Sequence, residues 1–188
     1  YHEAGHALVA TLSPHADPVH KVTIVPRGMA LGVTHQLPDK DKYSLQKEEA
    51  ETIISVLMGG RVAEEVVFGK ISNGAANDIE RASSIARKMV CEWGMSEELG
   101  PMSFKQSQDQ IFLAREMSNK NQVSEATAQV IDTEIKRIIF DNYAAAKALI
   151  QKNRDKLDKL AQALLEKEIV TGEEVKALFD IKPDPTPA

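Results

Sequence analysis

The sequence predicts a mainly α protein with one small β element near its start. Apolar residues recur at the three-to-four-residue spacing of amphipathic helices along most of the chain after residue 44. Alternating, β-branched stretches lie instead between residues 19 and 37. The chain has 188 residues, of which 43% are hydrophobic and 27% charged, as is usual for a globular protein that buries its own core.

The first predicted element is a helix from Tyr1 to about Ser13. Its apolar residues have helical spacing, and Pro14 ends it. A helix needs its first turn for nucleation and capping, yet almost nothing precedes His2. We therefore expect the natural helix to begin upstream, and this chain to be an N-terminally truncated fragment of a longer one.

The predicted β element consists of two strands. Residues Val19–Val25 alternate and are rich in β-branched side chains, and residues Pro26–Gly28 have turn composition. Residues Ala30–Leu37 predict the second strand, which Pro38 ends. Gly32 is unfavourable in a central strand, so we expect this strand at the edge of its sheet.

The rest of the chain predicts helices separated by turns. The pair Gly59-Gly60 lies inside the first of them and indicates either close helix packing or a kink. Thr171 and Glu174 form a T-x-x-E capping box for the last short helix. A polar segment, residues 102–122, shows no clear pattern. The predicted helices cover residues 45–69, 77–93, 124–152, 157–165 and 171–179.

Composition excludes several classes of protein. A net charge of -5 and only 5% aromatic residues argue against a nucleic-acid partner. Cys91 is the single cysteine, so neither an internal disulfide nor a thiolate metal cluster can form. No apolar run approaches the roughly 18–20 residues of a membrane span. We expect residues 1–179 to form one domain and residues 180–188 to be a disordered, proline-rich tail.

The most informative motif is His-Glu-x-x-His at His2–His6 on the first predicted helix. Residues four apart lie one turn apart on the same face, so both imidazoles can bind one zinc ion. Glu3 lies beside that face, where its carboxylate can accept a proton from an activated water. The alternative is a solvated helix face that happens to carry these three residues.

A catalytic zinc site needs a third protein ligand, and spacing alone does not choose it. An acidic residue near a helix N-terminus is also favoured by the helix dipole, and helix glutamates are usually solvated or paired. The candidates are His15, His20 and His35 in predicted loop or strand, Glu64 and Glu65 on a predicted helix, and Asp78 at the start of the next helix.

Several further motifs follow the first one in a fixed order. They are Val22–Gly28, Gly59–Glu65, Asn77–Ala82, Trp93–Ser96 and Leu99–Pro101. Together with His2–Ala7, they occur in the same order in the FtsH family of membrane-anchored AAA+ zinc proteases. From Tyr1 to about Phe179, the chain closely resembles the C-terminal peptidase domain of that family.

The resemblance implies a helical zinc-peptidase domain with its edge strand near the active site. It implies one Zn²⁺ per chain, bound by His2, His6 and Asp78. It also implies a metalloendopeptidase that hydrolyses unfolded or misfolded proteins by zinc-activated water, with Glu3 as the general base.

Further site residues follow from the same resemblance. Glu64 and Glu65 become candidates for orienting a ligand histidine through a hydrogen bond to the ring nitrogen that does not bind the metal. An extended substrate can add to the predicted edge strand through backbone hydrogen bonds that ignore side-chain identity; an ordinary edge strand is the other interpretation. The strand residues concerned are Leu31, Gly32, Val33 and Thr34.

The family also implies partners that this chain does not contain. No G-x-x-x-x-G-K-S/T phosphate loop occurs here, whereas FtsH proteins carry an AAA+ ATPase module and transmembrane helices upstream. ATP would therefore act only through that absent module. We expect a homohexamer that degrades unfolded or membrane proteins at the cytoplasmic face of the bacterial inner membrane, and a fragment that is itself soluble.

Two other functions are compatible with the sequence. One is a non-catalytic module that assembles the ATPase ring, and the other is a zinc-stabilised binding domain without hydrolysis. The presence of Glu3 beside His2, His6 and Asp78 favours the peptidase, because an inert site does not need a general base.

Overall fold

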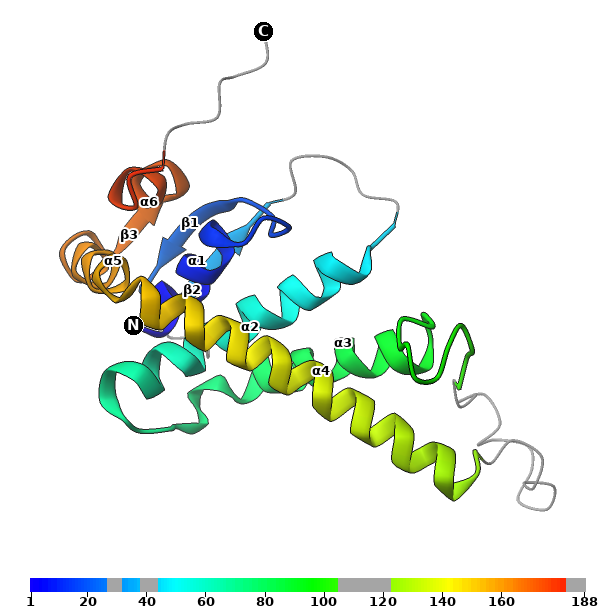
Figure 1. The fold of residues 1–188 in the computed structure, drawn as a ribbon. Helices are drawn as coiled ribbons and strands as arrows, with labels where there is room; N and C mark the ends of the chain where they lie inside the picture. The colour runs from blue at the N-terminus through cyan, green and yellow to red at the C-terminus, as the bar shows by residue number, and fades with distance from the viewer. Residues whose placement is uncertain (27–31, 38–43, 105–122, 182–188) are drawn as a thin grey trace, which may run out of the picture.

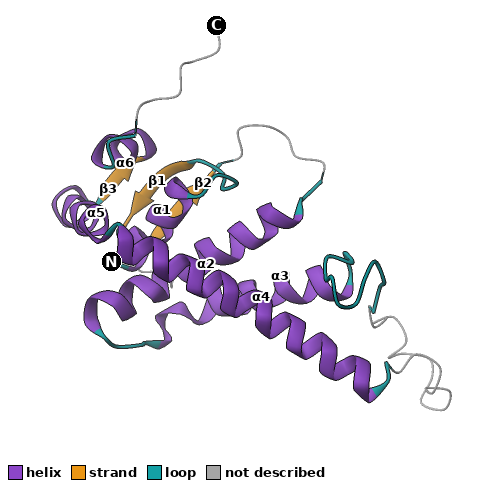
Figure 2. Ribbon diagram, in the orientation of Figure 1, coloured by secondary structure: helices purple, strands orange, loops and turns teal. Residues whose placement is uncertain are grey.

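The computed structural model describes residues 1–26, 32–37, 44–104 and 123–181. Within these residues the fold is mainly α with one small sheet, as the sequence predicts (Figures 1 and 2). The elements in chain order are α1 (His2–Leu12), β1 (Val19–Thr23), β2 (Val33–Gln36), α2 (Lys47–Phe68), the 3-10 turn η1 (Asn73–Ala75), α3 (Ala76–Cys91), α4 (Glu125–Lys152), α5 (Arg154–Lys167), β3 (Ile169–Thr171) and α6 (Gly172–Leu178).

The described strands form an antiparallel sheet in the order β2-β1-β3. Val22 in the central strand pairs with Thr34 of β2 and with Val170 of β3, which fixes the register. β2 therefore lies at an edge of this sheet, as predicted. β3 was not predicted, because its three residues are too few to show an alternating pattern.

β3 leads directly into α6 through the predicted capping box. Thr171 Oγ1 accepts a hydrogen bond from the Glu174 backbone N–H at 3.3 Å, and Glu174 Oε2 accepts one from the Thr171 backbone N–H at 2.9 Å. These two bonds satisfy backbone donors that the first turn of a helix otherwise leaves without partners. One residue thus ends the strand and caps the helix.

The central packing unit is the pair α1 and α2. α1 is buried from Ala4 to Ala10 because it lies between α2 and the sheet. A Cβ atom added to Gly5 would lie 2.3 Å from the carbonyl oxygen of Gly59, so the two backbones are in direct contact. α2 runs without a break through Gly59 and Gly60, so the glycine pair marks close helix packing.

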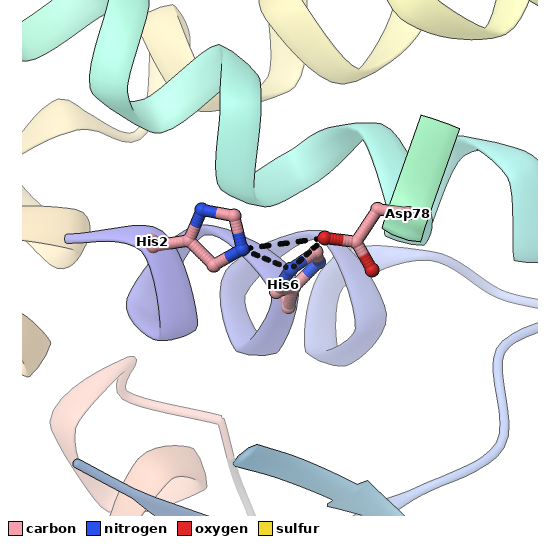
Figure 3. Close-up of side chains that lie close together, drawn as sticks. All are labelled: His2, His6 and Asp78. Carbon is pink, nitrogen blue, oxygen red and sulfur yellow. Dashed lines mark hydrogen bonds and ion pairs between the residues drawn. The ribbon is translucent and has the colours of Figure 1, made fainter. Parts of the chain in front are cut away.

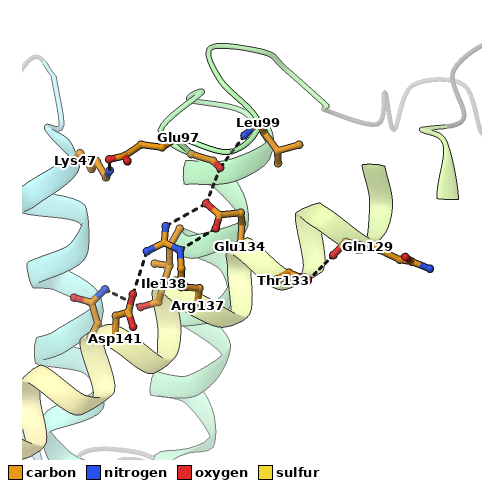
Figure 4. A network of polar contacts seen from close by, with 11 residues as sticks. Lys47, Glu97, Leu99, Gln129, Thr133, Glu134, Arg137, Ile138 and Asp141 are labelled. Carbon is orange, nitrogen blue, oxygen red and sulfur yellow. Dashed lines mark hydrogen bonds and ion pairs between the residues drawn. The ribbon is translucent and has the colours of Figure 1, made fainter. Parts of the chain in front are cut away.

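α4 covers α2 and α3 and carries a buried polar network (Figure 4). Glu134 accepts hydrogen bonds from Ser96 Oγ at 2.7 Å and from Arg137 Nε at 2.8 Å. The guanidinium of Arg137 is the main cause that holds the pKa of Glu134 below its usual range. Ser96 Oγ also accepts the Leu99 N–H at 3.3 Å, so the network ties the segment after α3 to α4.

Some sequence predictions fall outside the described residues. They concern most of the turn at 26–28, the strand residues Ala30 and Leu31 with Pro38 at the end of that strand, most of the polar segment 102–122, and residues 182–188 of the tail. Where the structure does describe the chain, none of its helices combines the length and hydropathy needed to cross a membrane.

Candidate metal centre

Three candidate ligand atoms converge between α1 and the start of α3 (Figure 3). His2 and His6 lie one turn apart on α1, and their Nε2 atoms are 3.1 Å apart. Asp78 Oδ2 lies 3.3 Å from His2 Nε2 and 3.4 Å from His6 Nε2. Among the described histidine, cysteine and acidic side chains, these three form the group whose ligand atoms all lie within 4.8 Å of one another, close enough to share a metal ion.

The spacing of these atoms fits a tetrahedral zinc ion. Zinc bonds of about 2.0–2.1 Å at tetrahedral angles place neighbouring ligand atoms about 3.3–3.4 Å apart. The observed separations of 3.1, 3.3 and 3.4 Å are close to that value. Two imidazole nitrogens and one carboxylate oxygen are also a donor set that catalytic zinc uses, with the fourth position left for water.

The opposite nitrogen of each imidazole is held by a hydrogen-bond acceptor. His6 Nδ1 lies 2.7 Å from the backbone carbonyl oxygen of Val56, which can only accept, so Nδ1 carries the proton. His2 Nδ1 lies 2.9 Å from Glu64 Oε1. Both contacts favour the tautomer whose Nε2 lone pair is directed at Asp78, as in metal-binding histidines generally.

The electrostatics of the site favour an ionised aspartate. Burial raises the pKa of Asp78, but its contacts with His2 and His6 lower that pKa by more, so the net value is far below the usual range. Burial lowers the pKa of His2, while Asp78 and Glu64 raise it by more. A proton and a metal cation therefore compete for the same imidazole nitrogen, and metal binding should release protons.

The face of α2 beside the imidazoles is bare backbone. A Cβ atom added to Gly60 would lie 2.6 Å from both His2 Cε1 and His6 Nε2. Any other residue at this position would fill the space next to the donor atoms. The glycine pair predicted close helix packing or a kink, whereas the position of Gly60 beside the candidate ligands depends on how α1 packs on α2.

The predicted general base, Glu3, lies next to His2 on α1, and its side chain faces β2. Thr34 Oγ1 donates a hydrogen bond to Glu3 Oε2 at 2.7 Å. Gly32 also lies against Glu3, because an added Cβ there would be 2.8 Å from Glu3 Cγ. The predicted edge strand therefore runs beside the predicted base, and Val33 lies between these two contact residues.

The two adjacent glutamates on α2 have different partners. Glu64 contacts His2 and also accepts a hydrogen bond from Ser72 Oγ at 3.0 Å. Glu65 accepts hydrogen bonds from the hydroxyl of Tyr143 and from Lys147 Nζ, the latter at 2.8 Å, so it links α2 to α4. The structure thus places Glu64, and not Glu65, in contact with the Nδ1 atom of a candidate ligand histidine.

The other candidate third ligands lie elsewhere. The structure groups Asp78 with the two histidines of α1 and leaves His15, His20 and His35 outside that group. His20 and His35 are exposed on β1 and β2, and His15 is exposed in the turn after α1.

Residues 1–178 match the model of peptidase family M41. The chain belongs to peptidase family M41. Its relatives include the "ATP-dependent zinc metalloprotease FtsH 1" of Thermoanaerobacter sp., 53% identical over 180 residues that cover 96% of this chain and 30% of the relative. The protein of the same name from Thermomicrobium roseum is 51% identical over 187 residues, covering 100% of this chain and 28% of the relative. "ATP-dependent zinc metalloprotease FtsH 4" of Sorangium cellulosum is 52% identical over 180 residues, covering 95% and 28%.

Membership of M41 confirms the resemblance to the FtsH peptidase domain that the motifs predict. It makes the chain a metallopeptidase domain by family, and the names of its relatives include zinc, which the donor set also fits. This M41 chain spans less than a third of the length of those relatives.

Proposed function

We propose that this M41 domain is a zinc metalloendopeptidase in which His2, His6 and Asp78 hold one Zn²⁺ and Glu3 is the general base. The observation that supports this best is the convergence of three donor atoms that lie 3.1–3.4 Å from one another. The Nδ1 atom of each imidazole also lies within hydrogen-bond distance of an acceptor oxygen. Glu3 directly follows the first ligand in the chain, so helix α1 carries both metal ligation and proton transfer.

The chemistry divides between the ion and the protein. When bound, Zn²⁺ would supply Lewis acidity, which polarises a scissile carbonyl and lowers the pKa of water to about 7. Glu3 accepts a proton from the attacking water and later delivers it to the leaving amine. Glu64 and the Val56 carbonyl keep the two imidazoles in the ligating tautomer.

We also propose that an extended substrate pairs with the outer edge of β2 and with the residue before it, along Gly32, Val33 and Thr34; Leu31, predicted to take part as well, lies outside the described residues. The Leu37 N–H donates to Pro18 O at 3.1 Å, so it points toward the β1 side. Because donors alternate along a strand, the N–H groups of Gln36 and Thr34 point outward. Backbone pairing of this kind suits a protease with low sequence specificity.

The whole protein is proposed to be an FtsH-type, ATP-dependent protease. The relatives are more than three times as long as this chain, and their names state ATP dependence. We propose an upstream AAA+ module and membrane segments, a hexameric ring, and unfolded or membrane-protein substrates at the cytoplasmic face of the bacterial inner membrane. The peptidase step itself, on a short peptide, needs no ATP in this scheme.

Metal analysis tests the ligand set. We expect about one zinc per chain in the wild type, strongly reduced in Asp78→Ala, and peptide cleavage that a chelator abolishes. Glu80→Ala is the matched control, because Glu80 is an exposed acid on the same helix. Stoichiometric zinc in Asp78→Ala would refute Asp78 as the third ligand.

A second variant separates the base from the ligands. Glu3→Gln keeps the shape of the side chain but cannot accept the proton, so we expect it to retain zinc and lose cleavage. Cleavage by Glu3→Gln at the wild-type rate would refute the base assignment. A zinc-loaded wild type that cleaves no peptide would favour a ring-assembly module or a zinc-stabilised binding domain.

A further inference from the structure

Thr34 of β2 is in direct contact with the proposed general base. Its Oγ1 lies 2.7 Å from Glu3 Oε2 and 3.1 Å from the backbone carbonyl oxygen of Glu3. A hydroxyl has a single proton to donate, and the shorter contact goes to the carboxylate, which is the stronger acceptor. Both side chains are partly buried, so water competes less for this bond than at an open surface.

Gly32 contributes to the same contact from the same face of the strand. Residues two apart in a strand point to the same side, so positions 32 and 34 both face α1. A Cβ atom added to Gly32 would lie 2.8 Å from Glu3 Cγ, so the bare backbone there accommodates the stem of the glutamate. The sheet fixes the position of Thr34 beside Glu3, because Thr34 pairs with the fully buried Val22 of β1.

We propose that Thr34 is a positioning residue that orients the carboxylate of Glu3 for proton transfer, with Gly32 providing the room for it. This inference rests on the proposed function of Glu3 as the base. A glutamate side chain has several rotatable bonds, and without a partner it samples many orientations. The hydrogen bond from Thr34 selects one of them before the substrate arrives, and such orientation contributes to the rate of the chemical step.

Thr34 lies between the proposed base and the proposed substrate-binding edge of β2. The side chain of Thr34 contacts the base, while its backbone N–H lies on the outer edge where the substrate is proposed to pair. One strand therefore fixes both the base and the peptide, so their relative position depends on the backbone of β2.

The test compares two substitutions at one position. Thr34→Val keeps the shape and the β propensity but removes the hydroxyl, whereas Thr34→Ser keeps the hydroxyl. In zinc-loaded protein acting on a short peptide, we expect Thr34→Val to lower kcat by about 10- to 100-fold, the range expected for a hydrogen bond to a charged group. KM and zinc content should stay at the wild-type values, and Thr34→Ser should restore most of kcat.

Thr133→Val is the matched control. Thr133 is exposed on α4, more than 50 residues along the chain from Asp78, and its hydroxyl donates to the carbonyl oxygen of Gln129 in the same helix at 2.8 Å (Figure 4). The substitution removes the same hydroxyl from the same residue type. We expect its kcat to stay within about twofold of the wild-type value, as for surface substitutions in general.

A second readout does not depend on activity. The ¹³C chemical shift of the Glu3 carboxyl, measured at one neutral pH, should change in Thr34→Val and stay close to the wild-type value in Thr34→Ser. A folded Thr34→Val protein with wild-type kcat would overturn the inference. A loss shared equally by Thr34→Ser, or a loss that appears in KM or in zinc content, would also overturn it, since it would indicate a structural role.

The two proposals fail in distinguishable ways. If Glu3→Gln abolishes cleavage while Thr34→Val cleaves normally, only the role of Thr34 is refuted. If the zinc-loaded wild type does not cleave peptides, or Glu3→Gln cleaves normally, then the proposed function fails and the positioning role of Thr34 falls with it.

Discussion

Replacing Gly60 with alanine tests whether the bare face of α2 is required for metal binding. The added Cβ would lie 2.6 Å from His2 Cε1 and from His6 Nε2, whereas ordinary contact begins at 3.4 Å. At least one ring would therefore have to move by about 0.8 Å, the difference between these distances. Metal–ligand distances tolerate only about 0.2 Å, so the displaced imidazole can no longer ligate well.

The expected loss in affinity is large enough to measure by unfolding. Disturbing only the residues behind metal ligands typically costs about 10- to 100-fold, so displacing a ligand should cost about 100-fold or more. Zinc at about 1,000 times the wild-type Kd stabilises the fold by about 4.1 kcal/mol, but by only about 1.4 kcal/mol when binding is 100-fold weaker. For a chain of this size, the zinc-induced rise in Tm should fall from about 8–16 °C to about 3–6 °C.

The assay combines zinc competition against a chromophoric chelator with thermal unfolding in the presence and absence of zinc. We expect metal-free Gly60→Ala to unfold close to the wild type, because the atoms it meets are the ends of side chains. Gly59→Ala is the matched control: its Cβ would lie 2.7 Å from the backbone oxygen of Gly5, so it should destabilise the metal-free fold itself. A folded Gly60→Ala protein with wild-type zinc affinity would refute the reasoning.

Two further predictions concern the substrate strand and the polar network on α4. Gln36→Pro removes a backbone N–H donor from the outer edge of β2. Gln36→Ala is its control, because both variants lose the hydrogen bond from the Gln36 side chain to the backbone oxygen of Asp17. We expect the peptide KM of Gln36→Pro to be severalfold higher than that of Gln36→Ala. Equal KM values in these two variants would contradict substrate pairing there. Arg137 lowers the pKa of the Glu134 carboxyl in the folded state. The ionised carboxylate therefore stabilises the fold at pH values above its unfolded pKa of about 4.3. This stabilisation is lost as the pH falls through the lower, folded-state pKa. Urea unfolding should therefore show Glu134→Gln less stable than wild type by about 1.5–3 kcal/mol near pH 7, with a difference that shrinks below about pH 4.3; a pH-independent difference would argue against the charge as its cause.

The local parts of the candidate metal centre could be predicted from sequence because helical periodicity determines them. His2 and His6 are four residues apart, so any helix over these positions brings their side chains to one face. Asp78 was different, because it lies more than 70 residues from both histidines and its approach depends on how α3 packs. Residue spacing left six candidates for the third ligand, and the resemblance to FtsH chose among them.

The features missed by sequence reasoning depend on single contacts between elements. Glu64 and Glu65 are neighbours in the chain, yet successive helix residues point about 100° apart, so one reaches His2 and the other reaches α4. The three residues of β3 form a strand only because β1 offers a partner. The contact of Thr34 with Glu3 had a usable signal, since Gly32 and Thr34 share a strand face, but only the packing of β2 on α1 showed its meaning.

One face of α2 organises the whole metal centre. Val56, Gly60 and Glu64 are spaced four residues apart, so they follow one another along the side of α2 that lies against α1. The first holds His6 through its carbonyl, the second leaves room beside the donor atoms, and the third holds His2.

The same face of α2 is also linked to Asp78, the proposed third ligand. Glu64 accepts a hydrogen bond from Ser72, whose hydroxyl caps the turn that leads into α3 and Asp78. The positions of the two imidazoles relative to Asp78 therefore depend on the depth at which α1 packs on α2, which the Gly5–Gly59 contact sets. Zinc affinity should then report on this helix packing as well as on the ligands, and the adjacent Gly59 and Gly60 variants separate the two contributions.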